Sequence, residues 1–240
     1  MELRSIVKSA VQARAAVGLA LAVFACALSA CGDGGDARGS AAQSKAESFT
    51  FLEVGRETEV TDGLRSTLSA KLGNDAIEHR GIIDLEAVAP GVLREHLPEL
   101  DALNRSLNSP PGERVEHDMI KLMYRYARSK ETPFDYVELV FDPQTRKPLY
   151  FRVRFKGEDA GMIAALKAKH GTPRDVAASG GGRALIWQKE GDTLVVSVLP
   201  DQFGKPVHHV AVFFTDHLQQ RLAAEQAQKA SKPRPGKSAF

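Results

Sequence analysis

The chain has too few cysteines for a disulfide framework. It contains two, Cys26 and Cys31, and Cys26 lies within an apolar stretch that has the character of an export signal. A mature chain without that stretch would hold one cysteine and no internal disulfide. We therefore expect the folded region to depend on its hydrophobic core.

The sequence also lacks a catalytic, metal-binding or nucleotide-binding motif. It has no Gly-x-Ser-x-Gly elbow, and the triple glycine at 180–182 is without the Lys-Ser/Thr of a phosphate loop. The seven histidines do not have metal-ligand spacing: Glu116-His117-Asp118 is consecutive, and His208-His209 would point to opposite faces of a strand. We predict no catalytic residues, no metal and no cofactor, and favour a non-enzymatic role while leaving an enzyme open.

An excess of one charge sign is absent as well. The whole chain has 32 basic and 30 acidic side chains. Residues 1–30 contain three of the basic and one of the acidic side chains, so 29 of each sign remain without them. The mature chain is formally neutral, and its charge does not favour a nucleic-acid partner.

The N-terminus has the features of an export signal. Arg4, Lys8 and Arg14 precede the uncharged run Ala15–Ala30, which is rich in Ala, Leu and Val. This run is shorter than the ~20 apolar residues of a membrane-spanning helix. An ordinary signal peptide cleaved near Ala30 would leave a free thiol, which proteins in oxidising compartments usually avoid.

The run ends in Leu28-Ser29-Ala30-Cys31, which resembles the lipobox of bacterial lipoproteins. This resemblance implies that residues 1–30 are removed between Ala30 and Cys31, that Cys31 is lipidated, and that its acyl chains hold the protein on a membrane. Gly32 follows the cysteine where such lipoproteins carry Asp for inner-membrane retention. The resemblance thus favours the outer membrane, facing the periplasm.

Composition divides the rest of the chain into three parts. Residues 31–48 are the acylated cysteine and a small, polar tether, and 231–240 form a basic tail that we expect to be disordered. The intervening region, 49–230, has enough apolar residues for one core. Two subdomains, 49–132 and 133–230, are an alternative.

The first half of this region has mainly helical patterns. Thr61 caps a helix in which Leu64, Leu68 and Leu72 are four residues apart before Gly73. Further helices are predicted near 91–96, from Pro98 and over 113–128, with short strands at 49–54 and 81–86.

The second half is rich in strands. Residues 136–141 and 149–156 alternate as an antiparallel hairpin with one solvated face, on which Glu138 and Asp142 can pair with arginines opposite. A helix capped by Asp159 and ended by Gly171 follows. Three strands and a last helix complete the pattern, at 184–189, 193–199, 207–214 and about 215–230. The predicted fold class is α+β, mainly an antiparallel sheet with helices packed on one face, the C-terminal half being β-β-α-β-β-β-α.

Two segments have the same pattern of a strand, a capped helix and a lysine-glycine ending. They end in Leu68-Ser69-Ala70-Lys71-Leu72-Gly73 and Leu166-Lys167-Ala168-Lys169-His170-Gly171. A degenerate duplication would explain the likeness. Coincidence is the preferred explanation, because Lys and Gly are common at helix ends.

Two basic stripes are the candidate binding surface for an envelope protein or an anionic polymer. The alternative is a solvated face with local acidic partners, which exposed charges usually form. The residues are Arg114, Lys121, Arg125 and Arg128 on the helix predicted over 113–128, and Arg152, Arg154 and Lys156 on one sheet face.

Several runs resemble uncharacterised lipoproteins of Gram-negative bacteria over roughly residues 49–217. They are His79 to Glu86, Pro111 to His117, Phe134 to Leu139 and Pro200 to Gly204. The resemblance implies an envelope location and no activity. Our hypothesis is a lipid-anchored, non-catalytic interaction or scaffolding module; the alternative is a periplasmic hydrolase with a site assembled from His117, Asp118 and His209.

Overall fold

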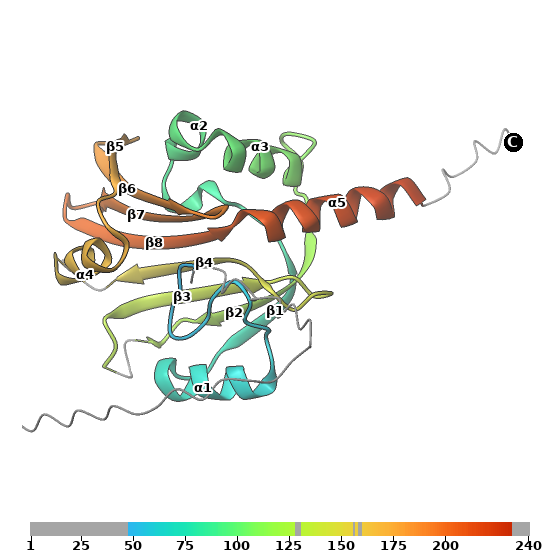
Figure 1. The fold of residues 1–240 in the computed structure, drawn as a ribbon, viewed down its shortest axis with the longest axis horizontal. Coiled ribbons are helices and arrows are strands. Elements are labelled where there is room, and N and C mark those ends of the chain that lie inside the picture. Colours follow the sequence, from blue (N-terminus) through green and yellow to red (C-terminus); the bar gives the residue numbers. More distant parts are fainter. Residues whose placement is uncertain (1–47, 128–130, 156, 158–159, 232–240) are drawn as a thin grey trace, which may run out of the picture. The chain divides into compact units, whose positions relative to one another are not determined.

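The computed structural model describes residues 48–127, 131–155, 157 and 160–231. The described part is one compact unit of helices and an eight-stranded antiparallel sheet, which confirms the α+β prediction (Figure 1). The helices are α1 (Asp62–Leu72), η1 (a short 3₁₀ helix, Glu86–Val88), α2 (Val92–His96), α3 (Pro98–Leu107), α4 (Ala160–His170) and α5 (Thr215–Ser231). The strands are β1 (Ala76–Gly81), β2 (His117–Tyr124), β3 (Phe134–Phe141), β4 (Pro148–Phe155), β5 (Arg174–Ala178), β6 (Gly182–Lys189), β7 (Asp192–Pro200) and β8 (Pro206–Phe214).

The strand order shows that the sheet consists of two similar halves. It runs β1-β2-β3-β4-β8-β7-β6-β5, so each half is four consecutive strands and the halves meet where β4 pairs with β8. An 11-residue helix precedes the first strand of each half, α1 in one and α4 in the other. Both helices are followed by a glycine with positive φ, 90° at Gly73 and 82° at Gly171. The two similar segments of the sequence thus occupy equivalent places, which supports a repeated unit.

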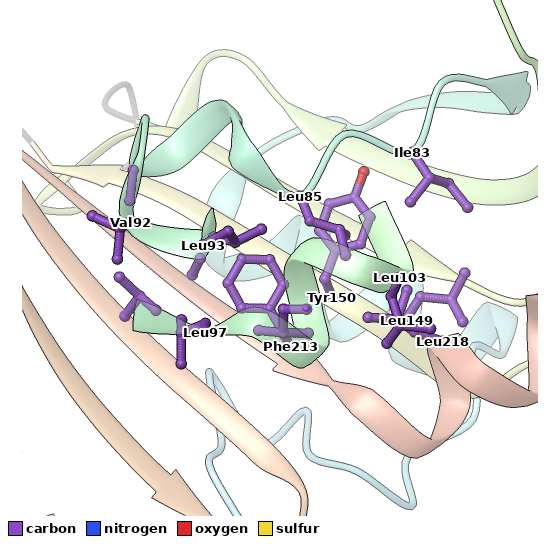
Figure 2. Packing of buried hydrophobic residues seen from close by; sticks show 14 of the residues in the cluster. Ile83, Leu85, Val92, Leu93, Leu97, Leu103, Leu149, Tyr150, Phe213 and Leu218 are labelled. Atoms are coloured by element: carbon purple, nitrogen blue, oxygen red, sulfur yellow. The ribbon is translucent and has the colours of Figure 1, made fainter. Parts of the chain in front are cut away.

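Helices cover both faces of the sheet, which corrects the prediction that they pack on one face. One core cluster joins β-strand residues to α2, α3 and α5, and contains Leu93, Leu103, Tyr150 and Phe213 (Figure 2). The other joins the opposite side of the same strands to α1, α4 and the N-terminal segment. Neighbouring residues of β4 divide between the clusters, Tyr150 in one and Phe151 in the other. The central strands are therefore buried on both faces.

Several local predictions are confirmed. Thr61 accepts a hydrogen bond from the Leu64 backbone N–H at 3.1 Å and caps α1. The helical stretch before residue 108 is broken at Leu97, and α3 begins at Pro98, because proline tolerates only the first turn of a helix. β3 and β4 form the predicted hairpin, and α5 begins at Thr215.

Other local predictions are wrong, for physical reasons. Residues 117–124 of the predicted helix 113–128 form strand β2, because a strand covered on both faces has a near-continuous apolar run instead of an alternating one. Residues 51 and 54 make one isolated bridge in place of a strand. β1 ends where the strand 81–86 was expected to begin, and the short edge strand β5 was not predicted.

A buried charge network attaches α5 to the sheet. The two ring nitrogens of His117 face the Glu225 carboxylate at 2.8 Å and the Leu107 carbonyl oxygen at 3.1 Å. The two ring nitrogens of His117 thus lie against a carboxylate and a carbonyl oxygen, two groups that only accept hydrogen bonds. Arg221 contacts Glu225 at 2.7 Å and Asp142 at 3.3 Å. These contacts join β2, the β3–β4 turn and α5 through His117, Arg221, Glu225 and Asp142.

The network lowers the pKa of Glu225 below its ordinary value. Burial opposes this by raising the pKa, but the hydrogen bond and charge of His117 and the charge of Arg221 together outweigh burial. A carboxyl with a depressed pKa in the folded state stabilises the fold at pH values above its unfolded pKa. That contribution is lost as the pH falls through the folded-state pKa.

We predict that Glu225→Gln lowers the free energy of unfolding at pH 7 by about 1–3 kcal/mol, because buried charges lose their partner. The difference from the unchanged protein should shrink as the pH falls below the ordinary carboxyl range and through the lowered folded-state pKa of Glu225. Urea denaturation at several pH values measures both effects. Glu113→Gln, on an exposed residue, is the control, and an equal loss in that variant would contradict the prediction.

Candidate functional site

An apolar cavity lies between α4 and the sheet. Its volume is about 280 Å³, and the wall is built from α4, from β4, β7 and β8, and from residues 49–52 and 133–134. Five phenylalanines form much of the lining: Phe49, Phe51, Phe134, Phe151 and Phe155. Concave apolar sites of this kind are the usual places where proteins bind small molecules.

The equivalent space in the other half of the sheet is filled. Counted from the glycine that ends each helix, Leu64, Leu68 and Leu72 of α1 correspond to Met162, Leu166 and His170 of α4. Leu68 and Leu72 are 0% and 1% exposed, and they pack in the core. Their α4 counterparts line the cavity and stay only half-buried. The same helical stripe therefore closes the core in the first half and covers a cavity in the second.

The end of α4 is fixed to the sheet beside the cavity. The indole N–H of Trp187 on β6 donates a hydrogen bond to the Gly171 carbonyl oxygen at 2.8 Å. The His170 ring meets Phe49 edge to face, with 5.0 Å between the ring centroids. These contacts hold the C-terminal end of α4 while its apolar stripe remains half-buried over the cavity.

Two lysines lie at this end of the cavity, each in contact with a lining residue. The Lys169 ammonium donates to Thr50 Oγ1 at 3.3 Å. The Lys189 ammonium lies 3.2 Å from His170 Nδ1 and 5.8 Å from the centroid of Phe49. Burial lowers the pKa of His170, and the charges of Lys189 and Lys169 lower it further. His170 is thus neutral at pH 7, and its Nδ1 accepts the hydrogen bond from Lys189.

The first predicted basic stripe does not form a helix face. Lys121 is on strand β2 and pairs with Glu78. Arg114 precedes β2 and pairs with Glu116 at 2.9 Å. Arg125 follows the strand, with a guanidinium nitrogen 3.7 Å from the Met123 sulfur. Arg128 lies outside the described residues.

The second stripe is on one sheet face as predicted, but that face is only partly solvated, since Arg152 is mostly buried and Arg154 is half-exposed. Arg152 pairs with Glu138 at 2.5 Å, as expected, and also donates to the Asp84 carbonyl oxygen at 3.2 Å. Arg154 is 3.9 Å from Asp135, and Lys156 lies outside the described residues. The other carboxylate of the expected hairpin pairs, Asp142, contacts Arg221 of α5 instead of a hairpin arginine.

Arg152 and Glu138 also border a polar cavity of about 240 Å³ with Tyr136, Arg154 and His209. The Tyr136 hydroxyl donates to Glu138 at 2.7 Å. Burial, and then the negative charge of Glu138, raise the pKa of Tyr136. Because the carboxylate is already held by a guanidinium and a hydroxyl, this arrangement is that of a structural ion pair.

The three residues of the hydrolase alternative are not brought together. His117 is on β2 and His209 on β8, with two strands between them, which separates them by roughly 14 Å at the usual strand spacing. Both nitrogens of His117 are already bonded, and Asp118 is exposed. Among the described residues, no three His, Cys, Asp or Glu side chains are placed to hold a metal ion.

Comparisons with protein-family models, with curated proteins and with solved structures gave no match. Over the part of the chain that the structure describes, no helix is long and apolar enough to cross a membrane. Inferences about function therefore rest on the geometry of this chain.

We predict that Leu68→Ala lowers the free energy of unfolding by about 2–5 kcal/mol, because it leaves a hole in a packed core. Leu166→Ala, at the matching position of α4, should cost about 1 kcal/mol or less, because this side chain is half-exposed and borders a cavity. Urea denaturation of the two variants measures the difference. Equal losses would mean that α4 packs as tightly as α1.

Proposed function

We propose that this chain is a lipid-anchored protein of the bacterial envelope that binds an apolar ligand without catalysing a reaction. The anchor is inferred from the lipobox-like sequence at 28–31 and the small, polar residues that follow. Gly32 supports a place on the outer membrane. The ligand site is the cavity under α4, and the N-terminal segment that follows the tether, residues 49–52, contributes to its wall.

One observation carries the proposal: the apolar stripe of α4 is half-buried over a phenylalanine-lined cavity, whereas the same stripe of α1 is packed. A cavity lined by apolar side chains forfeits dispersion contacts and lowers stability. A ligand that fills it restores those contacts and stabilises the folded state. A protein or polymer partner on the basic stripes is less well supported, because Arg114, Lys121 and Arg152 already have acidic partners.

We predict that Val210→Phe, which adds volume to the cavity wall, abolishes binding of a neutral apolar probe such as N-phenyl-1-naphthylamine. Its free energy of unfolding should stay within about 1 kcal/mol of that of the unchanged protein, because the cavity accommodates the ring. Probe fluorescence and urea denaturation measure the two quantities.

Val196→Phe is the matched control. Val196 is fully buried in the same core cluster and does not line the cavity. The larger ring there should cost about 1–3 kcal/mol and leave probe binding unchanged. Probe binding that survives in Val210→Phe would overturn the proposed site.

A separate prediction concerns the anchor. Cells fed a palmitate analogue with an alkyne tag should label the protein, and Cys31→Ser should remove the label and release the protein from the membrane fraction. The label is read after coupling to a fluorophore, and the location by fractionation. Label that persists in Cys31→Ser would refute acylation at this residue, and Cys26→Ser is the control.

A further inference from the structure

We infer that the cavity takes a single-chain anionic amphiphile, with the chain under α4 and the head group at Lys169 and Lys189. The inference rests on the proposed function and adds the chemistry of the ligand. The apolar chain is inferred from the lining of the cavity. The anionic head group is inferred from the neutral partners of the two lysines at one end of the cavity.

These two lysines have only neutral partners among the described residues. Lys169 donates to a threonine hydroxyl and Lys189 to a neutral imidazole. Lys71, which occupies the place of Lys169 on α1, pairs with the carboxylate of Glu53 at 3.2 Å instead. The half that holds the cavity thus lacks the acidic partner that its counterpart has, and two positive charges remain for an anion.

The preference for basic residues at the end of a helix explains the position of one lysine but not of the other. Basic residues in the last turn of a helix are favoured by the helix dipole, which would account for Lys169. Lys189 is on strand β6, so the preference for basic residues in the last turn of a helix does not account for it, although its ammonium lies 3.2 Å from His170 at the end of α4. It lies against Phe49 and His170, which both line the cavity. The positive charge is therefore adjacent to the apolar surface, as an amphiphile requires.

The volume limits the ligand to one chain. About 280 Å³ is just below the roughly 300–1,000 Å³ that is usual for small-molecule pockets. A lipid with two chains would leave one of them in water. A carboxylate or a phosphate is suited to two ammonium groups, so both head groups are tested.

The experiment compares laurate, dodecyl phosphate and dodecanol, which share one chain and differ in head group. The protein is the full chain with Cys31→Ser, so that no acyl group on that residue competes. Trp187 is the only tryptophan of the chain and pairs with Leu194 of the cavity wall, so its fluorescence reports binding.

Laurate or dodecyl phosphate should bind about tenfold or more tightly than dodecanol. Lys169→Gln/Lys189→Gln should remove that advantage and leave dodecanol affinity unchanged. Lys71→Gln, the matched control on α1, should alter none of the three affinities. Binding by only one of the two anions would identify the head group.

Three results would overturn the inference while the proposed function stands. The first is equal affinity for dodecanol and both anions, and the second is an anion advantage that survives in Lys169→Gln/Lys189→Gln. The third is an equal loss of affinity for all three ligands in that variant, which would show that the lysines shape the cavity and do not bind the head group. If none of the three ligands binds the Cys31→Ser protein in which both lysines are kept, the proposed function itself is refuted.

Discussion

The pairing of β4 with β8 is the constraint on which the rest of the structure depends. Five residue pairs, from Tyr150 with Phe213 to Arg154 with His209, join the two four-stranded halves into one sheet. Because the joint is at the centre, both faces of both strands must be covered. Tyr150 and Phe213 pack on the face covered by α2, α3 and α5. Phe151 and Val212 pack on the face covered by α1 and α4. Helices on both faces follow from this arrangement.

Covering both faces also forces polar residues of the strands into contact with one another. Glu138 and Arg152 are on the face that α2 and α3 cover, and they pair because neither can reach bulk water freely. His117, near the edge of the sheet, meets Glu225 of α5 for the same reason. Of the charges that suggested a binding surface, Lys121 and Arg152 pair with carboxylates and are largely buried, whereas Arg114 and Arg154 stay exposed. Two lysines outside those stripes, Lys169 and Lys189, have neutral partners beside the cavity.

Local signals were predictable from the sequence, and effects of the sheet as a whole were not. The Thr61 cap and the proline at 98 fix helix boundaries through chemistry confined to a few residues. β2 was mistaken for a helix because its apolar run has no alternation, and only burial on both faces explains that pattern. The cavity was beyond prediction, since Leu64-Leu68-Leu72 and Met162-Leu166-His170 have the same spacing, and the sequence alone does not say which stripe reaches the sheet.

The difference between the two halves has a physical consequence for function. In the first half of the sheet, α1 packs tightly through Leu68 and Leu72 and so stabilises the fold. Because the two halves form one sheet, this stability can offset the contacts that the second half lacks. α4 can then keep a half-buried stripe, held at its end by Trp187, without loss of the fold. Few buried apolar contacts favour a low free energy of local opening of a helix, which is the property that entry of the proposed apolar chain would require. The packed half of the molecule could in this way offset the stability that the proposed ligand site in the other half forgoes.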